Sequence, residues 1–448
     1  MTVIHASEAL LPEGWAKDVR IGVENGRIAA VTAGVPAEAG DERQTALVPG
    51  MANLHSHAFQ RGMAGLAEMR GPGSDSFWSW RTVMYRFALA MTPDDVEAVA
   101  AQLYVEMLEA GFTRVGEFHY LHHDHDGRPY ADIGEMAARI AAASEQSGIA
   151  LTLLPVLYAR SGFGGGAPGE GQRRFINDRE SFASLLERCH ALTATLDGGI
   201  TGVAPHSLRA VTPEELDFAV GLAGEGPIHI HIAEQAKEVE DCLAWSGLSP
   251  VEWLLANQKV DSRWCLIHAT HMTEDETRGM AAAGAIAGLC PVTEANLGDG
   301  TFPAPDFIAH GGRFGVGSDS NVLIGLADEL RQLEYSQRLA HRARNVLAAP
   351  GGSTGRALFD GAVAGGAAAL GAESGLAVGT AADFVSLAPR HGLPLAGDPL
   401  LDGWIFANAA AVDGVWVAGR KRVEGGRHVE RDAVAARFSA VMQRLAAA

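Results

Sequence analysis

The chain has 448 residues, of which 47% are hydrophobic and 20% are charged, and its formal net charge is −19. This composition is that of a packed globular protein and excludes a disordered chain. Because a strongly acidic surface repels nucleic acid and anionic lipid, we expect neither nucleic acid nor a membrane as a partner. An anionic small molecule would instead need its own local group of arginines.

The two ends of the chain share a β-rich pattern. Residues 1–48 alternate apolar and polar side chains around Asn25 and Gly26, a pair that is typical of a β-hairpin turn. The segment after residue 373 repeats this style. We therefore predict one β-sandwich-like domain built from residues 1–48 and 373–448, with a C-terminal helix.

The central segment, residues 49–372, alternates short apolar runs with helical patterns. The clearest helix covers 92–111, where Thr92 is a suitable N-cap, Pro93 suits the first turn and Gly111 ends the helix. Eight strand–helix repeats predict a (β/α)8 TIM-like barrel. The alternative, an open doubly wound sheet, would usually have a Gly-rich phosphate turn after its first strand, and none is present. The eight runs are ALVPGMANLHSH, TRVGEFHY, ALTLLPVLYA, ITGVAPHSL, IHIHIAEQ, CLIHATHM, AIAGLCPVTEANL and RFGVGSDS.

Histidines and carboxylates collect where these runs end. In such a barrel the reactive groups lie at the carboxyl ends of the strands, and a strand repeats every two residues, so His55 and His57 point to the same side. A catalytic zinc-type site needs about three protein ligands and one open position for water. We expect such a site from His55, His57, one histidine of the fifth run and Asp319, and both zinc and ferrous iron suit this ligand set.

The ordered motifs resemble those of the amidohydrolase superfamily: H-x-H in the first run, H-x-x-E in the fifth, histidine in the sixth and S-D-S in the eighth. No lysine lies in any of the eight runs, so the chain is similar to the mononuclear deaminase branch, which binds one divalent ion. The resemblance implies one ion held by His55, His57, His231 and Asp319, with catalytic work by Glu234, His268 and Asp319.

Other histidines near these positions receive a structural interpretation. His229 matches no role in this branch, and strand alternation places it one layer deeper, so we predict that it packs in the core. The histidine-rich loop 119–127 is interpreted as a polar loop and not as a second metal site. Arg61 is expected to pair with a carboxylate of the protein.

The long loop after the first run suggests the substrate. Its arginines, with those after the fourth run, favour a small substrate that carries carboxylates. The strings LHSHAFQR, EFHYLHH, HIAEQ and PVTEANLGDG resemble the formimidoylglutamate deiminase family, which implies hydrolysis of N-formimino-L-glutamate to N-formyl-L-glutamate and ammonia in histidine degradation. The same resemblance implies substrate contacts by Gln60, Arg81, Tyr120, His206 and Arg209.

Two alternatives stay open. A deaminase of an aromatic amidine, such as guanine or an adenosine derivative, would use stacking aromatics, and Trp78 and Trp80 are available for that purpose. A metal-binding barrel without turnover would not need the proton-transfer set. Four scattered cysteines and the lack of a visible signal peptide predict a cytoplasmic protein, and the resemblance implies a homodimer.

Overall fold

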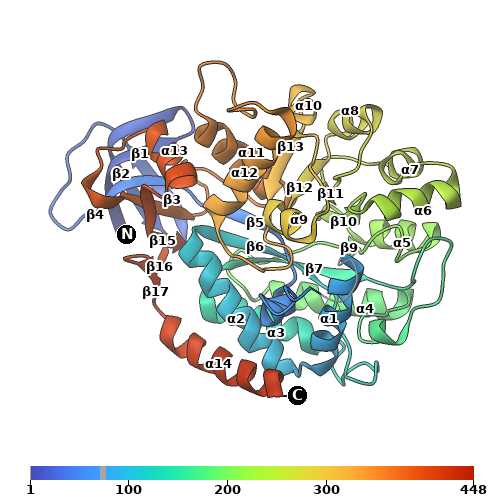
Figure 1. Cartoon of the computed structure of the whole chain (residues 1–448). Coiled ribbons are helices and arrows are strands. Elements are labelled where there is room, and N and C mark those ends of the chain that lie inside the picture. Colours follow the sequence, from blue (N-terminus) through green and yellow to red (C-terminus); the bar gives the residue numbers. More distant parts are fainter. Residues whose placement is uncertain (1, 71–76, 448) are drawn as a thin grey trace.

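The computed structural model describes residues 2–70 and 77–447, and it places a β-sheet made from both chain ends beside a larger α/β body (Figure 1). The terminal sheet has eight strands in the order β17-β16-β15-β14-β4-β1-β2-β3. Its central pairing joins the two ends of the chain, because β14 runs antiparallel to β4. The strands are β1 (Thr2–Leu11), β2 (Gly14–Glu24), β3 (Arg27–Thr32), β4 (Glu42–Pro49), β14 (Phe384–Pro389), β15 (Ala410–Val417), β16 (Arg420–Glu424) and β17 (Arg427–His428).

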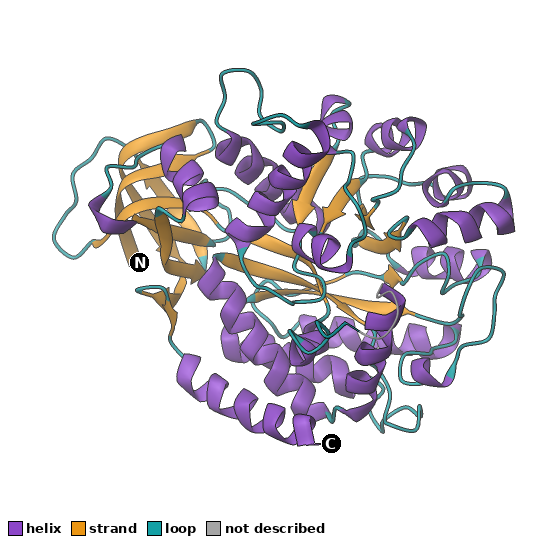
Figure 2. Ribbon diagram, in the orientation of Figure 1, coloured by secondary structure: helices purple, strands orange, loops and turns teal. Residues whose placement is uncertain are grey.

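The α/β body contains parallel strands with helices outside them (Figure 2). One sheet contains β5 to β8, with β9 paired to β7, and another contains β10 to β13. Strands β8 and β9 together occupy the fourth position, so eight strand positions follow one another along the chain. Their bounds are β5 (Met51–Ser56), β6 (Phe112–His119), β7 (Ala150–Leu157), β8 (Ile200–Thr201), β9 (Ala204–Pro205), β10 (Ile228–Ile232), β11 (Trp264–His268), β12 (Ile286–Leu289) and β13 (Arg313–Val316).

The two sheets join at both edges, which closes the predicted barrel. A parallel bridge between Val203 and Ile228 connects the β9 region to β10, and a bridge between Ser56 and Asp319 connects the end of β5 to the segment after β13. All eight positions therefore end at one rim. This confirms the (β/α)8 expectation and places the carboxyl ends of the first, fifth, sixth and eighth positions around one centre.

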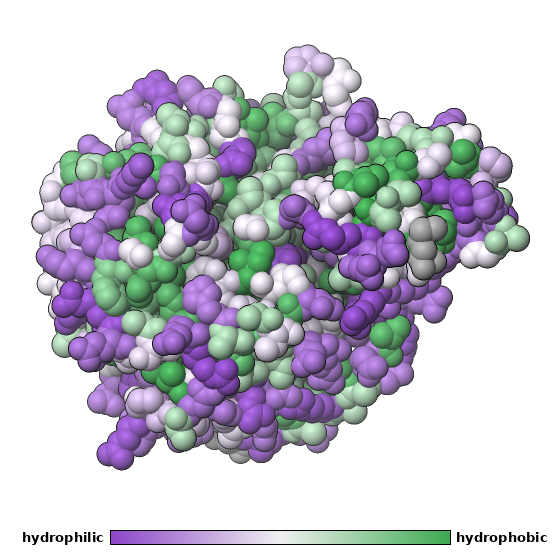
Figure 3. Space-filling view, turned by 180° about the vertical axis from the view of Figure 1, so that it is seen from behind, coloured by the Kyte–Doolittle hydropathy of each residue, from purple (hydrophilic) through white to green (hydrophobic). Residues whose placement is uncertain are grey.

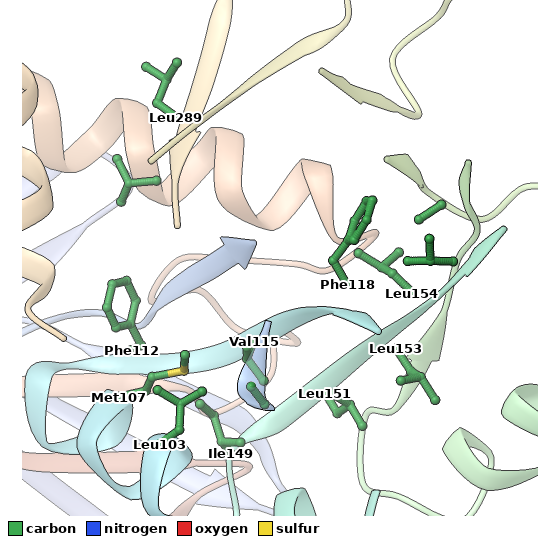
Figure 4. Close-up of a cluster of buried hydrophobic side chains, with 14 of the residues drawn as sticks. Leu103, Met107, Phe112, Val115, Phe118, Ile149, Leu151, Leu153, Leu154 and Leu289 are labelled. Carbon is green, nitrogen blue, oxygen red and sulfur yellow. The ribbon is translucent and has the colours of Figure 1, made fainter. Parts of the chain in front are cut away.

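Helices surround the barrel and bury its apolar side chains. Figure 4 shows part of this core, in which Phe112, Phe118 and Leu154 from β6 and β7 lie among leucine and methionine side chains. The helices and short 3-10 turns are η1 (Ala58–Met63), α1 (Phe77–Ala90), α2 (Pro93–Ala110), α3 (Glu135–Ser147), η2 (Glu170–Gln172), α4 (Arg179–Thr193), α5 (Pro213–Leu222), α6 (Ala236–Ser246), α7 (Pro250–Asn257), α8 (Glu274–Ala283), α9 (Pro291–Leu297), α10 (Ala304–Ala309), α11 (Leu326–His341), α12 (Thr354–Ala369), η3 (Arg390–Gly392), α13 (Asp398–Ala407) and α14 (Arg431–Ala447).

Helix α2 has the ends that its sequence predicts. The Thr92 side chain and Asp95 form a reciprocal capping box, an arrangement that contributes about 1 kcal/mol. Gly111 ends the helix in a left-handed conformation with φ of 102°, which glycine adopts without strain. At the far end of the chain, α14 packs along α2, where Arg437 pairs with Glu97 at 2.7 Å.

Two predicted runs differ from the strands that form. The first run divides at Gly50, because β4 pairs within the terminal sheet and only β5 enters the barrel. The seventh run is a strand only as far as Leu289. The residues PVTEANL form α9 instead, since Pro291 suits a first helical turn and Gly298 ends the helix in a left-handed conformation.

The terminal strands form one curled sheet where we predicted a sandwich-like domain. The predicted hairpin is present, with Asn25 and Gly26 both at positive φ between β2 and β3. A bridge from Arg27 to Ala381 brings the β3 edge to the segment before β14, so the sheet encloses its own small core around Phe384. The division into domains 1–48 with 373–448 and 49–372 stays a prediction.

The outer face seen from behind combines hydrophilic residues with smaller apolar groups (Figure 3). Within the described part of the chain, no helix has both the length and the apolar character needed to cross a bilayer. The predicted homodimer stays a prediction.

Small residues in α12 allow that helix to lie directly on the barrel. A Cβ at Gly365 would fall inside the van der Waals radius of the Phe314 carbonyl oxygen on β13. Backbone atoms cannot retreat as a flexible side chain can, so this contact requires glycine.

We expect Gly365→Ala to destabilise the protein by about 1–3 kcal/mol or more, because the added methyl overpacks against backbone. The matched control is Gly221→Ala in α5, where a Cβ meets nothing within 4 Å and the helix gains from the lost glycine. Thermal unfolding of both variants checks this. An unchanged melting temperature in Gly365→Ala would show that α12 does not approach the barrel so closely.

Candidate active site

Four buried side chains from three strand ends converge at the barrel rim. The Nε2 atom of His55 lies 3.2 Å from Nε2 of His57 and 3.0 Å from Nε2 of His231. Oδ1 of Asp319 lies 3.4 Å from Nε2 of His55 and 3.2 Å from Nε2 of His57. One ligand atom from each of the four residues lies within 4.8 Å of the others, which is the arrangement of a metal site.

Backbone carbonyls fix which imidazole nitrogen faces this centre. Nδ1 of His57 lies 3.0 Å from the Phe118 carbonyl oxygen, and Nδ1 of His231 lies 3.1 Å from the His206 carbonyl oxygen. A neutral ring that donates from Nδ1 presents a lone pair at Nε2. The Nε2 atoms of His57 and His231 therefore have the protonation that a metal ligand requires.

Burial disfavours the charged form of two histidines of the centre, His55 and His231. It lowers the pKa of His55 to about 3 and that of His231 well below its ordinary value. Burial alone would raise the pKa of Asp319, but hydrogen bonds with His55 and His57 hold it well below its ordinary value. Neutral imidazoles and an ionised carboxylate are the forms that bind a divalent ion.

A second group of side chains lies next to the metal centre. His268 Nε2 is 4.0 Å from Glu234 Oε1 and 3.8 Å from Asp319 Oδ2, while His268 Nδ1 is 3.4 Å from Glu294 Oε1. Burial opposes the charge on His268, but the facing carboxylates raise its pKa to about 10. Burial raises the pKa of Glu234, so this carboxyl group holds a proton more readily than an exposed glutamate.

A cavity opens in front of these groups. Glu234 and His268 lie on its wall beside three of the four metal-centre residues. Every residue predicted to contact substrate also lines it, and the complete set of those residues is Gln60, Arg81, Tyr120, His206 and Arg209.

The polar side chains that line the cavity contact one another and other lining residues. Gln60 Nε2 donates to the Tyr120 hydroxyl at 2.7 Å. The Arg81 guanidinium lies over the Tyr85 ring, 5.5 Å from its centroid. Arg209 Nη2 is 3.8 Å from Glu234 Oε2, so the cavity contains arginines and carboxylates together. Of the two tryptophans, Trp80 lines the cavity, whereas the Trp78 side chain lies outside the described residues.

The histidines and the arginine that received a structural interpretation do not line this cavity. His229 is fully buried and its Nε2 is 2.7 Å from the Ala369 carbonyl oxygen, which confirms core packing. Arg61 pairs with Glu106 at 2.8 Å, as expected. In loop 119–127, histidine rings contact backbone carbonyls, and the metal-type clusters found among the described residues do not include that loop.

Several cavity residues were not anticipated from the sequence. Tyr85 and Phe175 come from segments that carry no motif, and Tyr158 follows β7 in a run interpreted only as a strand. No spacing rule predicts these aromatic contacts. The contact of Glu294 with His268 depends on α9 being a helix.

Comparison with known proteins identifies the class. The Amidohydrolase family model matches residues 46–422, and the chain belongs to the amidohydrolase family. A model of the N-terminal domain of formimidoylglutamate deiminase HutF matches residues 1–45.

Particular relatives narrow this assignment. The chain is 51% identical to formimidoylglutamate deiminase of Pseudomonas aeruginosa, over 99% of this chain and 100% of the relative. It is also similar to a crystal structure of an amidohydrolase from Brucella melitensis, with 65% identity, a TM-score of 0.98 and complete coverage of both chains. An adenosine deaminase from Xanthomonas campestris with bound zinc shares the fold, with a TM-score of 0.81, 22% identity and coverage of 100% of this chain and 99% of the other.

The metal centre predicts a selective loss of metal. We expect His231→Ala to lose the bound divalent ion, because it removes one converging nitrogen. The matched control is His229→Gln on the same strand, which should keep the ion, since His229 contacts only a core carbonyl in the described structure. Elemental analysis of both purified proteins measures this. Equal metal content in the two variants would contradict the assignment of His231.

Proposed function

We propose that this enzyme hydrolyses N-formimino-L-glutamate to N-formyl-L-glutamate and ammonia. The observation that carries the proposal is the match to formimidoylglutamate deiminase at 51% identity over 99% of the chain. The cavity supports it, because Arg81 and Arg209 lie in the same space as Glu234 and Asp319. A substrate with two carboxylates and an amidine-like cation has charges that match both groups.

We further propose that His55, His57, His231 and Asp319 hold one divalent ion, with zinc as the native metal. The support is that one set of four converging ligands lies among the described residues and that the barrel strands contain no lysine. Ferrous iron suits the same ligands. When bound, the ion lowers the pKa of a coordinated water to about 7 and so supplies hydroxide at neutral pH.

Asp319 and Glu234 transfer protons in the reaction, and His268 orients the attacking water. Asp319 Oδ2 accepts the proton that the attacking water loses, and His268 Nε2, at 3.8 Å from that oxygen, orients the water. Oxygen adds to the C=N carbon, and the π electrons of that bond move to nitrogen. Glu234 then delivers a proton to the terminal nitrogen, and the C–N bond breaks so that ammonia leaves. The added oxygen forms the carbonyl bond as its remaining proton passes to the now ionised Glu234, which gives the formyl product.

The rest of the cavity holds the glutamate part of the substrate. We assign Arg81 and Arg209 to the two carboxylates, and Gln60, Tyr120 and His206 to hydrogen bonds around them. Each guanidinium presents paired N–H donors that match a carboxylate. Because the Arg209 side chain is largely buried, its ion pair with a substrate carboxylate is stronger there than on an exposed surface.

The rival reading is a deaminase of an aromatic amidine, and Trp80 on the cavity wall favours it. A planar nucleobase has no carboxylate to match the paired N–H donors of Arg81 and Arg209. An ammonia-release assay distinguishes formiminoglutamate deimination from deamination of an aromatic amidine. We expect turnover of N-formimino-L-glutamate, with guanine and S-adenosylhomocysteine inert, and the reverse preference would overturn the proposal.

The assignment of Glu234 predicts a separation of chemistry from binding. Glu234→Gln keeps the size of the side chain but removes the carboxyl group that transfers the proton. We expect turnover to fall by about 10²-fold or more, while metal content and melting temperature stay at wild-type values. Steady-state kinetics with elemental analysis tests this. A near-normal kcat would transfer the proton-carrying role to another group, such as Glu294 or Glu117.

The two arginines predict dependence on the substrate carboxylates. Arg81→Met and Arg209→Met should each cost about 2–5 kcal/mol of transition-state binding, which lowers kcat/KM more than tenfold. A mono-carboxylate analogue should be insensitive to the variant whose partner it lacks. Arg188→Met is the matched control, because Arg188 pairs with Asp132 at 2.9 Å and does not line the cavity. Equal losses with both substrates for both variants would mean that these arginines only support the fold.

A further inference from the structure

Glu238 is a buried carboxylate that the reaction steps above do not use. It lies in the first turn of α6 and has no exposed surface. Its Oε2 accepts a hydrogen bond from the Glu234 backbone N–H at 3.2 Å, and its Oε1 lies 3.7 Å from Nε of Arg209. One side chain thus contacts both the group assigned to proton transfer and a group assigned to substrate carboxylates.

Arg209 lies between two carboxylates and is in hydrogen-bond contact with neither. Its Nη2 is 3.8 Å from Glu234 Oε2, which is similar to the distance from its Nε to Glu238. Within the described residues, both Arg209 Nε and Glu238 Oε1 are buried without a hydrogen-bond partner. Burying a polar atom without a hydrogen-bond partner costs free energy unless a ligand supplies that partner. The guanidinium is therefore shared between two attractions and is available to a bound substrate.

This balance matters because a tight pair between Arg209 and Glu234 would disable both residues. A guanidinium in contact with Glu234 would favour its ionised form, which has no proton to deliver. The same contact would turn the N–H donors of Arg209 away from a substrate carboxylate. The negative charge of Glu238 pulls Arg209 in the other direction.

The backbone at this place also needs support. Ala233, directly before Glu234, has φ of +50°, a left-handed conformation that is strained for alanine. The Ala233 carbonyl accepts the His271 N–H at 3.0 Å, and Glu238 accepts the next N–H. These two hydrogen bonds hold the turn that directs the Glu234 side chain into the cavity.

We infer that Glu238 is a positioning residue for the deimination reaction: its charge keeps Arg209 away from Glu234 and directed toward the substrate carboxylate. This inference rests on the proposed function. It assigns to α6 the coupling between the substrate-binding end and the proton-transfer end of the cavity.

The test is a double-mutant cycle in the full-length, metal-loaded enzyme with N-formimino-L-glutamate. Glu238→Gln retains an oxygen to accept the Glu234 N–H but removes the charge that attracts Arg209. The cycle compares wild type, Glu238→Gln, Arg209→Met and the double variant. Glu240→Gln, an exposed position on the same helix, removes the same charge and serves as the control. Metal content and melting temperature are measured for every protein.

We expect Glu238→Gln to lower kcat at least tenfold with metal content unchanged, and Glu240→Gln to stay within twofold of wild type. The double variant should stay within twofold of Arg209→Met alone, because without Arg209 there is nothing to hold away from Glu234. Glu238→Asp, which keeps the charge, should recover part of the activity. If Glu238→Gln does not fold, Glu238→Met takes its place in the cycle, because methionine is similar in size and also lacks the charge.

Losses that multiply in the double variant would overturn the inference, because Glu238 would then act independently of Arg209. A Glu238→Gln enzyme within twofold of wild type would overturn it as well. Failure of the proposed function is a different result: the wild-type enzyme would release no ammonia from N-formimino-L-glutamate, and both proposals would fall.

Discussion

Closure of the barrel between its first and last strand positions is the constraint on which the site depends. The Asp319 N–H donates to the His55 carbonyl at 2.9 Å, and the Asp319 carbonyl accepts the His57 N–H at 3.1 Å. The residues that close the ring are thus the proposed metal ligands themselves. Gly317 permits this, since a Cβ there would lie 2.7 Å from the His55 nitrogen. The same hydrogen bonds therefore close the barrel and fix the positions of the proposed metal ligands.

The chemistry beside this closure depends on charges that burial alone would suppress. Removing ionised groups from water is costly, so each one persists through specific partners. Asp319 stays ionised through the histidines, and His268 stays cationic through Glu234 and Glu294. Arg209 is held between two carboxylates in the same way. The active site is therefore a mutually dependent set of charges, in which a change at one residue alters the protonation of its neighbours.

The sequence predicted the features that follow from local rules and missed those that depend on distant contacts. The two-residue repeat of a strand predicted that His55 and His57 point in the same direction, and the barrel expectation placed them at the carboxyl end of their strand. Capping residues predicted where α2 begins and ends. The division at Gly50 was missed because both halves of that run are apolar, and only pairing with β14 separates them. Tyr158 and Glu238 carry no spacing signal, since their partners lie on other elements.

The pairing of β4 with β14 also has a consequence for biosynthesis. Pro49 pairs with Phe384, so the middle of the terminal sheet joins residues separated by most of the chain. A ribosome releases the N-terminal strands long before β14 exists, and contacts of such long sequence separation form slowly. The edge of β4 that pairs with β14 therefore stays unpaired while the barrel residues are synthesised. A nascent chain arrested before β14 would expose that edge to other chains, and it would be the point at which chaperones are needed most.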